Sequence, residues 1–210
     1  MNTDDSLTAQ YQLLRSRIES ELRPPAVILV TSACSGDGKS VTAHGLVDCL
    51  AKVGHRVVLA DASMSASGFK LSRSINGAAR RPIIPLPLDE RDTTGLRGSV
   101  QSFVREMQDK FDFTIIDGTP FMRSNVSMLL ASAVDGVLLT VRLGRALSND
   151  DELTSRTLEH AKANVLGVVA VAADAITGFR LPTVQPMSDA RVLTSEPISD
   201  EILTAAGAAR

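Results

Sequence analysis

Residues 33–40 read Ala-Cys-Ser-Gly-Asp-Gly-Lys-Ser and combine two glycines with a lysine and a hydroxyl group. Gly36 and Gly38 allow a tight turn whose backbone N–H groups converge on an anion at the N-terminus of the following helix. Lys39 adds a positive charge for the β- and γ-phosphates, and the Ser40 hydroxyl can ligate Mg²⁺. The pattern therefore predicts a phosphate loop that binds a nucleoside polyphosphate. We expect the contacts to come from Ser35, Gly36, Asp37, Gly38, Lys39, Ser40 and Val41.

One position departs from the strict pattern G-x-x-x-x-G-K-[ST], because Ala33 replaces the first glycine. Alanine is small enough for the loop to form. The alternative is an ordinary glycine-containing turn. The position of Gly-Lys-Ser, between an apolar run at 27–31 and a helical pattern that begins near residue 40, argues against that alternative.

Two aspartates at the ends of apolar runs indicate which reaction the phosphate loop could support. Asp117 closes the run at 112–117 and has the form of a Walker B carboxylate that holds magnesium. Asp61 closes the run at 55–61, where it could orient an attacking hydroxyl or water and contact the metal. The predicted catalytic residues are thus Asp61 and Lys39, and the predicted metal ligands are Ser40, Asp117 and Asp61. The alternative for either aspartate is a cap on the next helix.

Strand-like and helical patterns alternate along the chain and would position these residues. The apolar runs lie at 26–31, 55–61, 112–117, 135–141 and 166–173, and helical patterns lie at 40–53, 98–110, 121–133 and 149–163. Such alternation predicts an α/β protein with a three-layer αβα P-loop NTPase fold and a mainly parallel central sheet. Ligands of such sheets bind outside the carboxyl ends of the strands.

The chain divides into three predicted parts. Residues 1–24 form an amphipathic helix with Leu13, Leu14 and Ile18 at helical spacing, and residues 25–175 form the nucleotide-binding domain. Residues 176–210 are expected to be a partly flexible tail with a short final helix from Asp200. Within the domain, the proline-containing segment 80–92 reads as an irregular connection or a short edge strand.

Composition excludes several classes of function. A chain of 210 residues with a net charge of −2 has no overall attraction to nucleic acid or anionic membranes. The sequence shows neither an export signal nor a run long enough to span a membrane, so we expect a cytoplasmic protein. Cys34 and Cys49 lack paired spacing, and the three histidines are dispersed, which leaves no basis for zinc or serine-hydrolase chemistry.

Taken together, residues 11–174 resemble the cytoplasmic kinase domain of bacterial tyrosine kinases (BY-kinases) of capsule and exopolysaccharide export. These kinases lie within the deviant-Walker ATPases, which include the partition and Min proteins. Residues 32–40 are similar to the family's Ser-Ala-x-x-Gly-Glu-Gly-Lys-Ser, and 134–145 are close to a late strand of the family. Cys34 stands where partition and Min ATPases carry a signature lysine, which favours the kinase branch.

Several positions depart from the family. Ala62, Ser63 and Met64 follow Asp61, where the family has a second aspartate and then a basic residue. Val171 stands where these kinases often carry an asparagine that reads the base.

Two further departures affect assembly and substrate. Of the glutamate and two arginines that the family uses for ring assembly, Arg15 is retained. Tyr11 is the one tyrosine in the sequence, so the chain lacks the family's tyrosine tail.

The resemblance implies an ATP-binding, kinase-like regulator of polysaccharide polymerisation and export, with ATP/ADP and Mg²⁺ as cofactors. It also implies the cytoplasmic segment of an inner-membrane polysaccharide co-polymerase as partner, and peripheral association with the membrane through that partner. A homo-oligomer is left open, turnover is expected to be weak or partner-dependent, and no nucleic acid is expected. The alternatives are a positioning ATPase of the partition or Min type, and a nucleotide-binding module without turnover.

Overall fold

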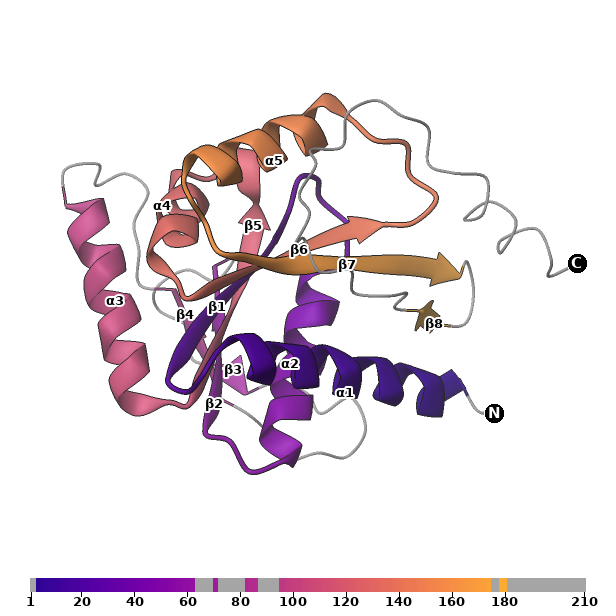
Figure 1. Cartoon of the computed structure of the whole chain (residues 1–210), viewed down its shortest axis with the longest axis horizontal. Coiled ribbons are helices and arrows are strands. Elements are labelled where there is room, and N and C mark those ends of the chain that lie inside the picture. The colour runs from indigo at the N-terminus through magenta and orange to yellow at the C-terminus, as the bar shows by residue number, and fades with distance from the viewer. Residues whose placement is uncertain (1–2, 63–69, 72–81, 87–94, 175–177, 181–210) are drawn as a thin grey trace, which may run out of the picture.

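The computed structural model describes residues 3–62, 70–71, 82–86, 95–174 and 178–180 (Figure 1). Its helices are α1 (Thr3–Glu21), α2 (Lys39–Lys52), α3 (Leu96–Lys110), the 3₁₀ turn η1 (Phe121–Arg123), α4 (Asn125–Ala133) and α5 (Asn149–His160). Its strands are β1 (Ala26–Ser32), β2 (Val57–Asp61), β3 (Lys70–Leu71), β4 (Pro82–Pro85), β5 (Phe113–Pro120), β6 (Gly136–Arg142), β7 (Val165–Asp174) and β8 (Gly178–Arg180).

The strands form one sheet in the order β3-β4-β2-β5-β1-β6-β7-β8. The six central strands, from β4 to β7, pair in parallel, and the short outer strands β3 and β8 pair antiparallel. This arrangement confirms the predicted α/β fold with a mainly parallel sheet.

Helices cover both faces of the sheet and create two apolar cores (Figure 1). One core packs α1 and α2 against the sheet, and the other packs α3, α4 and α5 against the opposite face. Strand β1 contributes to both cores because alternate residues of a strand point to opposite faces. Ile28 lies in the first core and Leu29 in the second, and all seven residues of β1 are buried. The loop that follows this central strand therefore starts from a rigid support.

Helix α1 buries a different stripe from the one that the sequence suggested. The buried residues are Tyr11, Leu14 and Ile18, whereas Leu13 is 55% exposed. The Tyr11 hydroxyl donates a hydrogen bond of 2.8 Å to the Val41 carbonyl in the first turn of α2. The apolar stripe of α1 is thus a tertiary contact with α2.

Two boundaries differ from the predictions. Strand β5 continues past Asp117 to Pro120, so the expectation that Asp117 ends its strand is wrong. The helical pattern at 121–133 is split because Ser124 has extended backbone angles and caps α4, where its Oγ accepts a hydrogen bond from the Ser127 N–H.

Some predictions fall on parts of the chain that the structure does not describe. Within segment 80–92, β4 is the expected short strand, but it is not at the edge of the sheet, because β3 pairs with its outer side. Ser63, Met64 and the tail from residue 181 onward lie outside the described residues. No helix in the described part of the chain has the length and apolar character required to cross a membrane.

Candidate phosphate-binding site

The glycine-rich loop leaves the carboxyl end of β1 and leads into α2. Gly36 and Gly38 have φ angles of +84° and +86°, in the left-handed region that glycine adopts without strain. A Cβ atom at Gly38 would lie 2.8 Å from the side chain of Val171 on β7. Position 38 therefore requires glycine both for its backbone conformation and for close packing against β7.

Lys39 is buried, although its position in a loop at the start of a helix suggests an exposed side chain. Its side chain turns back into the loop, where Nζ donates hydrogen bonds to Ser32 Oγ at 2.9 Å and to the Cys34 carbonyl at 3.3 Å. Burial lowers the pKa of Lys39, although the nearby charges of Asp117 and Asp37 oppose that shift. A partly desolvated ammonium group at the start of a helix is a favourable partner for a polyanion.

Asp61 and Asp117 lie opposite each other on the adjacent strands β2 and β5. Burial raises the pKa of Asp117, and the repulsion from Asp61 acts in the same direction. A hydrogen bond with Ser40 opposes the shift, as do the nearby charges of His44 and Lys39. The structure thus brings together the three predicted metal ligands, Ser40, Asp117 and Asp61.

These residues fit a hydrated divalent cation. Mg²⁺ prefers oxygen ligands and is commonly held by one or two carboxylates with substrate phosphates. Ser40 is exposed and Asp61 is partly exposed, so the oxygen ligands are open to solvent on one side. His44 is a member of this group that sequence reasoning missed, because its position one turn after Ser40 has meaning only once α2 is placed beside β5.

Asp37 belongs to a second group of charges, which the sequence did not reveal. Its carboxylate is 1% exposed and accepts hydrogen bonds from the Cys34 N–H and from Arg145. Arg145 also pairs with Asp151 in the first turn of α5. The predicted nucleotide contact by Asp37 is therefore restricted to its backbone, because its side chain is already engaged inside the protein.

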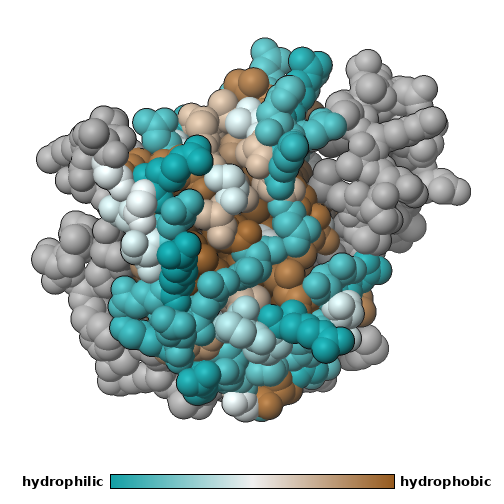
Figure 2. Space-filling view, turned by 60° about the vertical axis from the view of Figure 1, so that its left-hand side comes forward, coloured by the Kyte–Doolittle hydropathy of each residue, from teal (hydrophilic) through white to brown (hydrophobic). Residues whose placement is uncertain are grey.

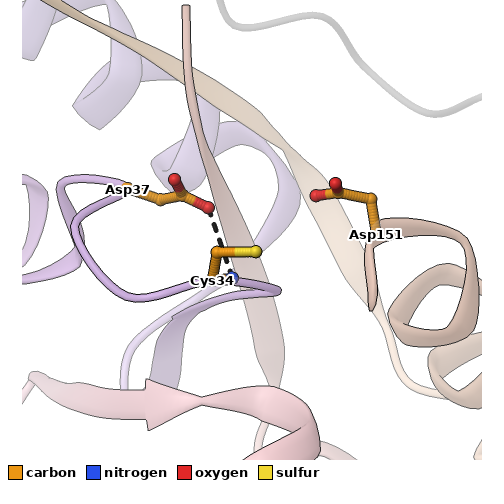
Figure 3. A group of neighbouring side chains, drawn as sticks. All are labelled: Cys34, Asp37 and Asp151. Carbon is orange, nitrogen blue, oxygen red and sulfur yellow. Dashed lines mark hydrogen bonds between the residues drawn. The ribbon is translucent and has the colours of Figure 1, made fainter. Parts of the chain in front are cut away.

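Figure 3 shows the side chains of Cys34, Asp37 and Asp151, which contribute one sulfur and two carboxylates. Their ligand atoms lie within 4.8 Å of one another. Thiolate sulfur and carboxylate oxygen are both ligand types that bind metal ions. However, Nη2 of Arg145 lies 3.2 Å from Asp37 and 2.7 Å from Asp151. The guanidinium group bridges the two carboxylates, so the arrangement is an ion-pair network.

A groove of about 690 Å³ lies elsewhere, between α3 and α4 (Figure 2). Apolar side chains form much of its lining, and polar side chains including Arg97 and Arg105 also contribute. None of the loop residues or carboxylates described above lines this groove.

We compared the chain with known proteins by sequence and by structure. No protein-family model matches the chain. The tyrosine-protein kinase CpsD of Streptococcus agalactiae is 24% identical over 184 residues, which cover 76% of this chain and 80% of that protein. The kinase domain of the Escherichia coli tyrosine kinase ETK superposes with a TM-score of 0.65 at 17% identity, covering 84% of this chain and 80% of that kinase domain. The resemblance to bacterial tyrosine kinases is confirmed.

The chain also superposes on a solved enzyme that is not a kinase. Cobyrinic acid a,c-diamide synthase from Mycobacterium smegmatis, with a bound ATP analogue and magnesium, superposes with a TM-score of 0.56 at 18% identity. The match covers 72% of this chain and 77% of that enzyme. The P-loop NTPase-like fold is therefore shared beyond the kinases.

The structure shows the surroundings of three residues at which the sequence was compared with BY-kinases. Val171, at the place of the asparagine that often reads the base, is buried and packs against Gly38. Arg15, at a position that the resemblance links to ring assembly, has its Nε 3.9 Å from Oε2 of Glu19 on the same helix. Tyr11 is buried between α1 and α2.

Proposed function

We propose that this protein is an ATP-binding, kinase-like regulator of exopolysaccharide or capsule polymerisation and export that acts with a membrane co-polymerase. The observation that carries the proposal is the position of Lys39. Its ammonium group is buried inside a loop that has two left-handed glycines and leads into a helix N-terminus. Desolvation of that cation is costly, and the phosphates of a nucleotide would offset the cost.

Each residue of the site has a separate role in the proposal. The backbone of residues 35–41 and Lys39 would hold the phosphates, and Ser40 and Asp117 would hold Mg²⁺. Asp61 would orient the attacking hydroxyl or water and contact the metal, while MgATP supplies the phosphoryl group. Since Ser63 and Met64 stand where the family has a second aspartate and a basic residue, we expect weak turnover by the isolated protein.

The nucleotide site is tested by calorimetric titration of MgATP into the wild type and Lys39→Met. We expect the variant to lose most of its affinity while circular dichroism shows an intact fold. Lys52→Met is the matched control, because Lys52 is an exposed lysine in the last turn of the same helix. Equal affinity of the wild type and Lys39→Met would rule out the assignment.

Turnover separates the regulator from a nucleotide-binding module. Phosphate release should be slow for the wild type alone, should rise when the cytoplasmic segment of a co-polymerase is added, and should fall in Asp61→Asn. Robust turnover that Asp61→Asn leaves unchanged would show that Asp61 is not catalytic. If the co-polymerase segment produces no increase in turnover at any concentration, a module without turnover is the better description.

Binding experiments separate the regulator from a positioning ATPase. We expect the co-polymerase segment to bind more tightly when ATP is bound, because linkage makes the coupling between the two ligands reciprocal. Nucleotide-dependent binding to DNA, without binding to any export-pathway membrane protein, would instead favour a positioning ATPase.

A further inference from the structure

The phosphate loop carries an acidic side chain at its centre, which is unfavourable for binding a polyanion. Asp37 lies between Gly36 and Gly38, and its carboxylate is 1% exposed. A buried carboxylate without a partner is strongly destabilising. A negative charge at this position would also repel the phosphates that the loop is proposed to bind.

Arg145 offsets both the cost of burying the Asp37 charge and its repulsion of phosphates. It lies in the connection between β6 and α5, 108 residues after Asp37 in the sequence, and its guanidinium group reaches both carboxylate oxygens of Asp37. Nε is 3.3 Å from Oδ1 and Nη2 is 3.2 Å from Oδ2. A bidentate pair of this kind fixes orientation as well as charge. Asp37 Oδ2 also accepts a hydrogen bond of 3.3 Å from the Cys34 N–H, which links the loop backbone to the same carboxylate.

Arg145 is in turn held by α5. Its Nη1 and Nη2 atoms donate hydrogen bonds of 2.8 and 2.7 Å to Asp151, the carboxylate seen opposite Asp37 in Figure 3. Asp151 also accepts hydrogen bonds from the N–H and the hydroxyl of Ser148, which caps α5. The hydrogen bond from Arg145 is the main reason that the pKa of Asp151 is lowered to about 2. The network therefore runs from the first turn of α5 to the centre of the loop.

We propose that Arg145 is a positioning residue that presets the phosphate loop for nucleotide by neutralising Asp37, with Asp151 holding the guanidinium in place. This inference rests on the proposed nucleotide site and adds a control point to it. Movement of the N-terminal end of α5 would release Arg145 and leave the Asp37 charge in the loop. Nucleotide affinity is thereby coupled to the conformation of the connection between β6 and α5.

The test uses the full chain and calorimetric titration of MgATP. In Arg145→Gln we expect affinity at pH 7.5 to fall by about tenfold or more, because the buried carboxylate loses its counter-ion. The double variant Asp37→Asn/Arg145→Gln should return to within about threefold of the wild type, because the loop then holds no unpaired charge. Asp151 also loses Arg145 in this variant, but it lies outside the loop and keeps its hydrogen bonds from Ser148. Arg142→Gln is the matched control, since Arg142 is an exposed arginine on the preceding strand.

A conservative variant separates charge from shape. The charged groups around Asp37 are Arg145 and Lys39, with Asp151 on the far side of the guanidinium. Arg145→Lys keeps the positive charge but not the bidentate geometry, so its affinity should lie between those of the wild type and Arg145→Gln. A lysine variant as weak as Arg145→Gln would show that the charge is not the reason for the loss.

Each result decides the proposal. Wild-type affinity in Arg145→Gln, or a double variant as weak as the single one, overturns it. If Arg145→Gln does not fold but the double variant folds and binds MgATP, the buried charge is the reason and the proposal is supported. Failure of the wild type itself to bind MgATP would instead remove the proposed nucleotide site.

Discussion

The phenol ring of Tyr11 occupies the space that a side chain at Gly45 would need. A Cβ atom built at Gly45 would overlap the Tyr11 ring at Cζ, Cε1 and the hydroxyl oxygen. The same hydroxyl donates its hydrogen bond to the Val41 carbonyl one turn earlier in α2. Helix α1 therefore docks on α2 by inserting a tyrosine over a glycine, and the close approach requires both residues.

We expect Gly45→Ala to lower the free energy of unfolding by about 1–3 kcal/mol, because the new methyl group overpacks the interface between α1 and α2. Gly98→Ala is the matched control, because Gly98 lies in α3 with open space around it. That control should gain about 0.5–1 kcal/mol from the better helix propensity of alanine. Urea unfolding of both variants measures the difference, and a stabilised Gly45→Ala would contradict the packing described above.

Tyr11 should not accept phosphate in the folded protein. Its hydroxyl is buried and hydrogen-bonded, and burial raises the pKa of the phenol, an effect that the charge of Asp48 increases. Mass spectrometry after incubation with MgATP should find no more than trace phosphate on Tyr11. Stoichiometric phosphorylation in protein that remains folded would contradict the burial of this residue.

Asp117→Asn should stabilise the protein without nucleotide while removing its response to MgATP. Burial raises the pKa of Asp117, so the folded state binds the proton more tightly than the unfolded state does. The ionised carboxylate therefore costs stability at neutral pH, and that cost disappears as the pH falls to the ordinary carboxyl value of 3.8.

Thermal unfolding at pH 7.5 and pH 4 measures this effect. The Asn variant should melt above the wild type at pH 7.5 without ligand, and the gap should close toward pH 4. At 100 times the dissociation constant, MgATP should add about 2.7 kcal/mol to the wild type and much less to the variant. A variant that keeps the full MgATP response would show that Asp117 does not hold the metal.

Asp151 should stabilise the fold at neutral pH and lose that contribution in acid. Its pKa is lowered to about 2, mainly by the hydrogen bond from Arg145. For a lowered carboxyl pKa, the stabilisation is complete above the unfolded value near 3.8 and is lost as the pH falls through the folded value. Asp151→Asn should therefore cost up to about 2 kcal/mol at pH 6 and little at pH 2.

Urea unfolding of Asp151→Asn across this pH range gives the measurement, and Asp150→Asn at the neighbouring exposed position is the control. A cost for Asp151→Asn that does not change with pH would mean that the residue acts through packing or capping alone.

The sequence by itself was enough for those parts of the protein that depend on local patterns. The alternation of apolar runs and helical stretches predicted the α/β fold, because the periods of strands and helices are properties of short segments. Gly36 and Gly38 predicted the turn after β1, and both have the positive φ angles that the turn requires. The expectation that Asp117 ends its strand failed because β5 continues by pairing with β1, including the pair of Ser32 with Pro120.

Only the tertiary structure decided which side chains face one another. The insertion of Tyr11 over Gly45 and the pairing of Arg145 with Asp37 each join segments that no local pattern connects. Asp37 and Arg145 illustrate the reason, because 108 residues separate them and neither segment indicates the other residue as its partner. Their contact arises when β1 and β6 pair in the sheet, and the carboxyl ends of parallel strands bring distant loops to the same edge.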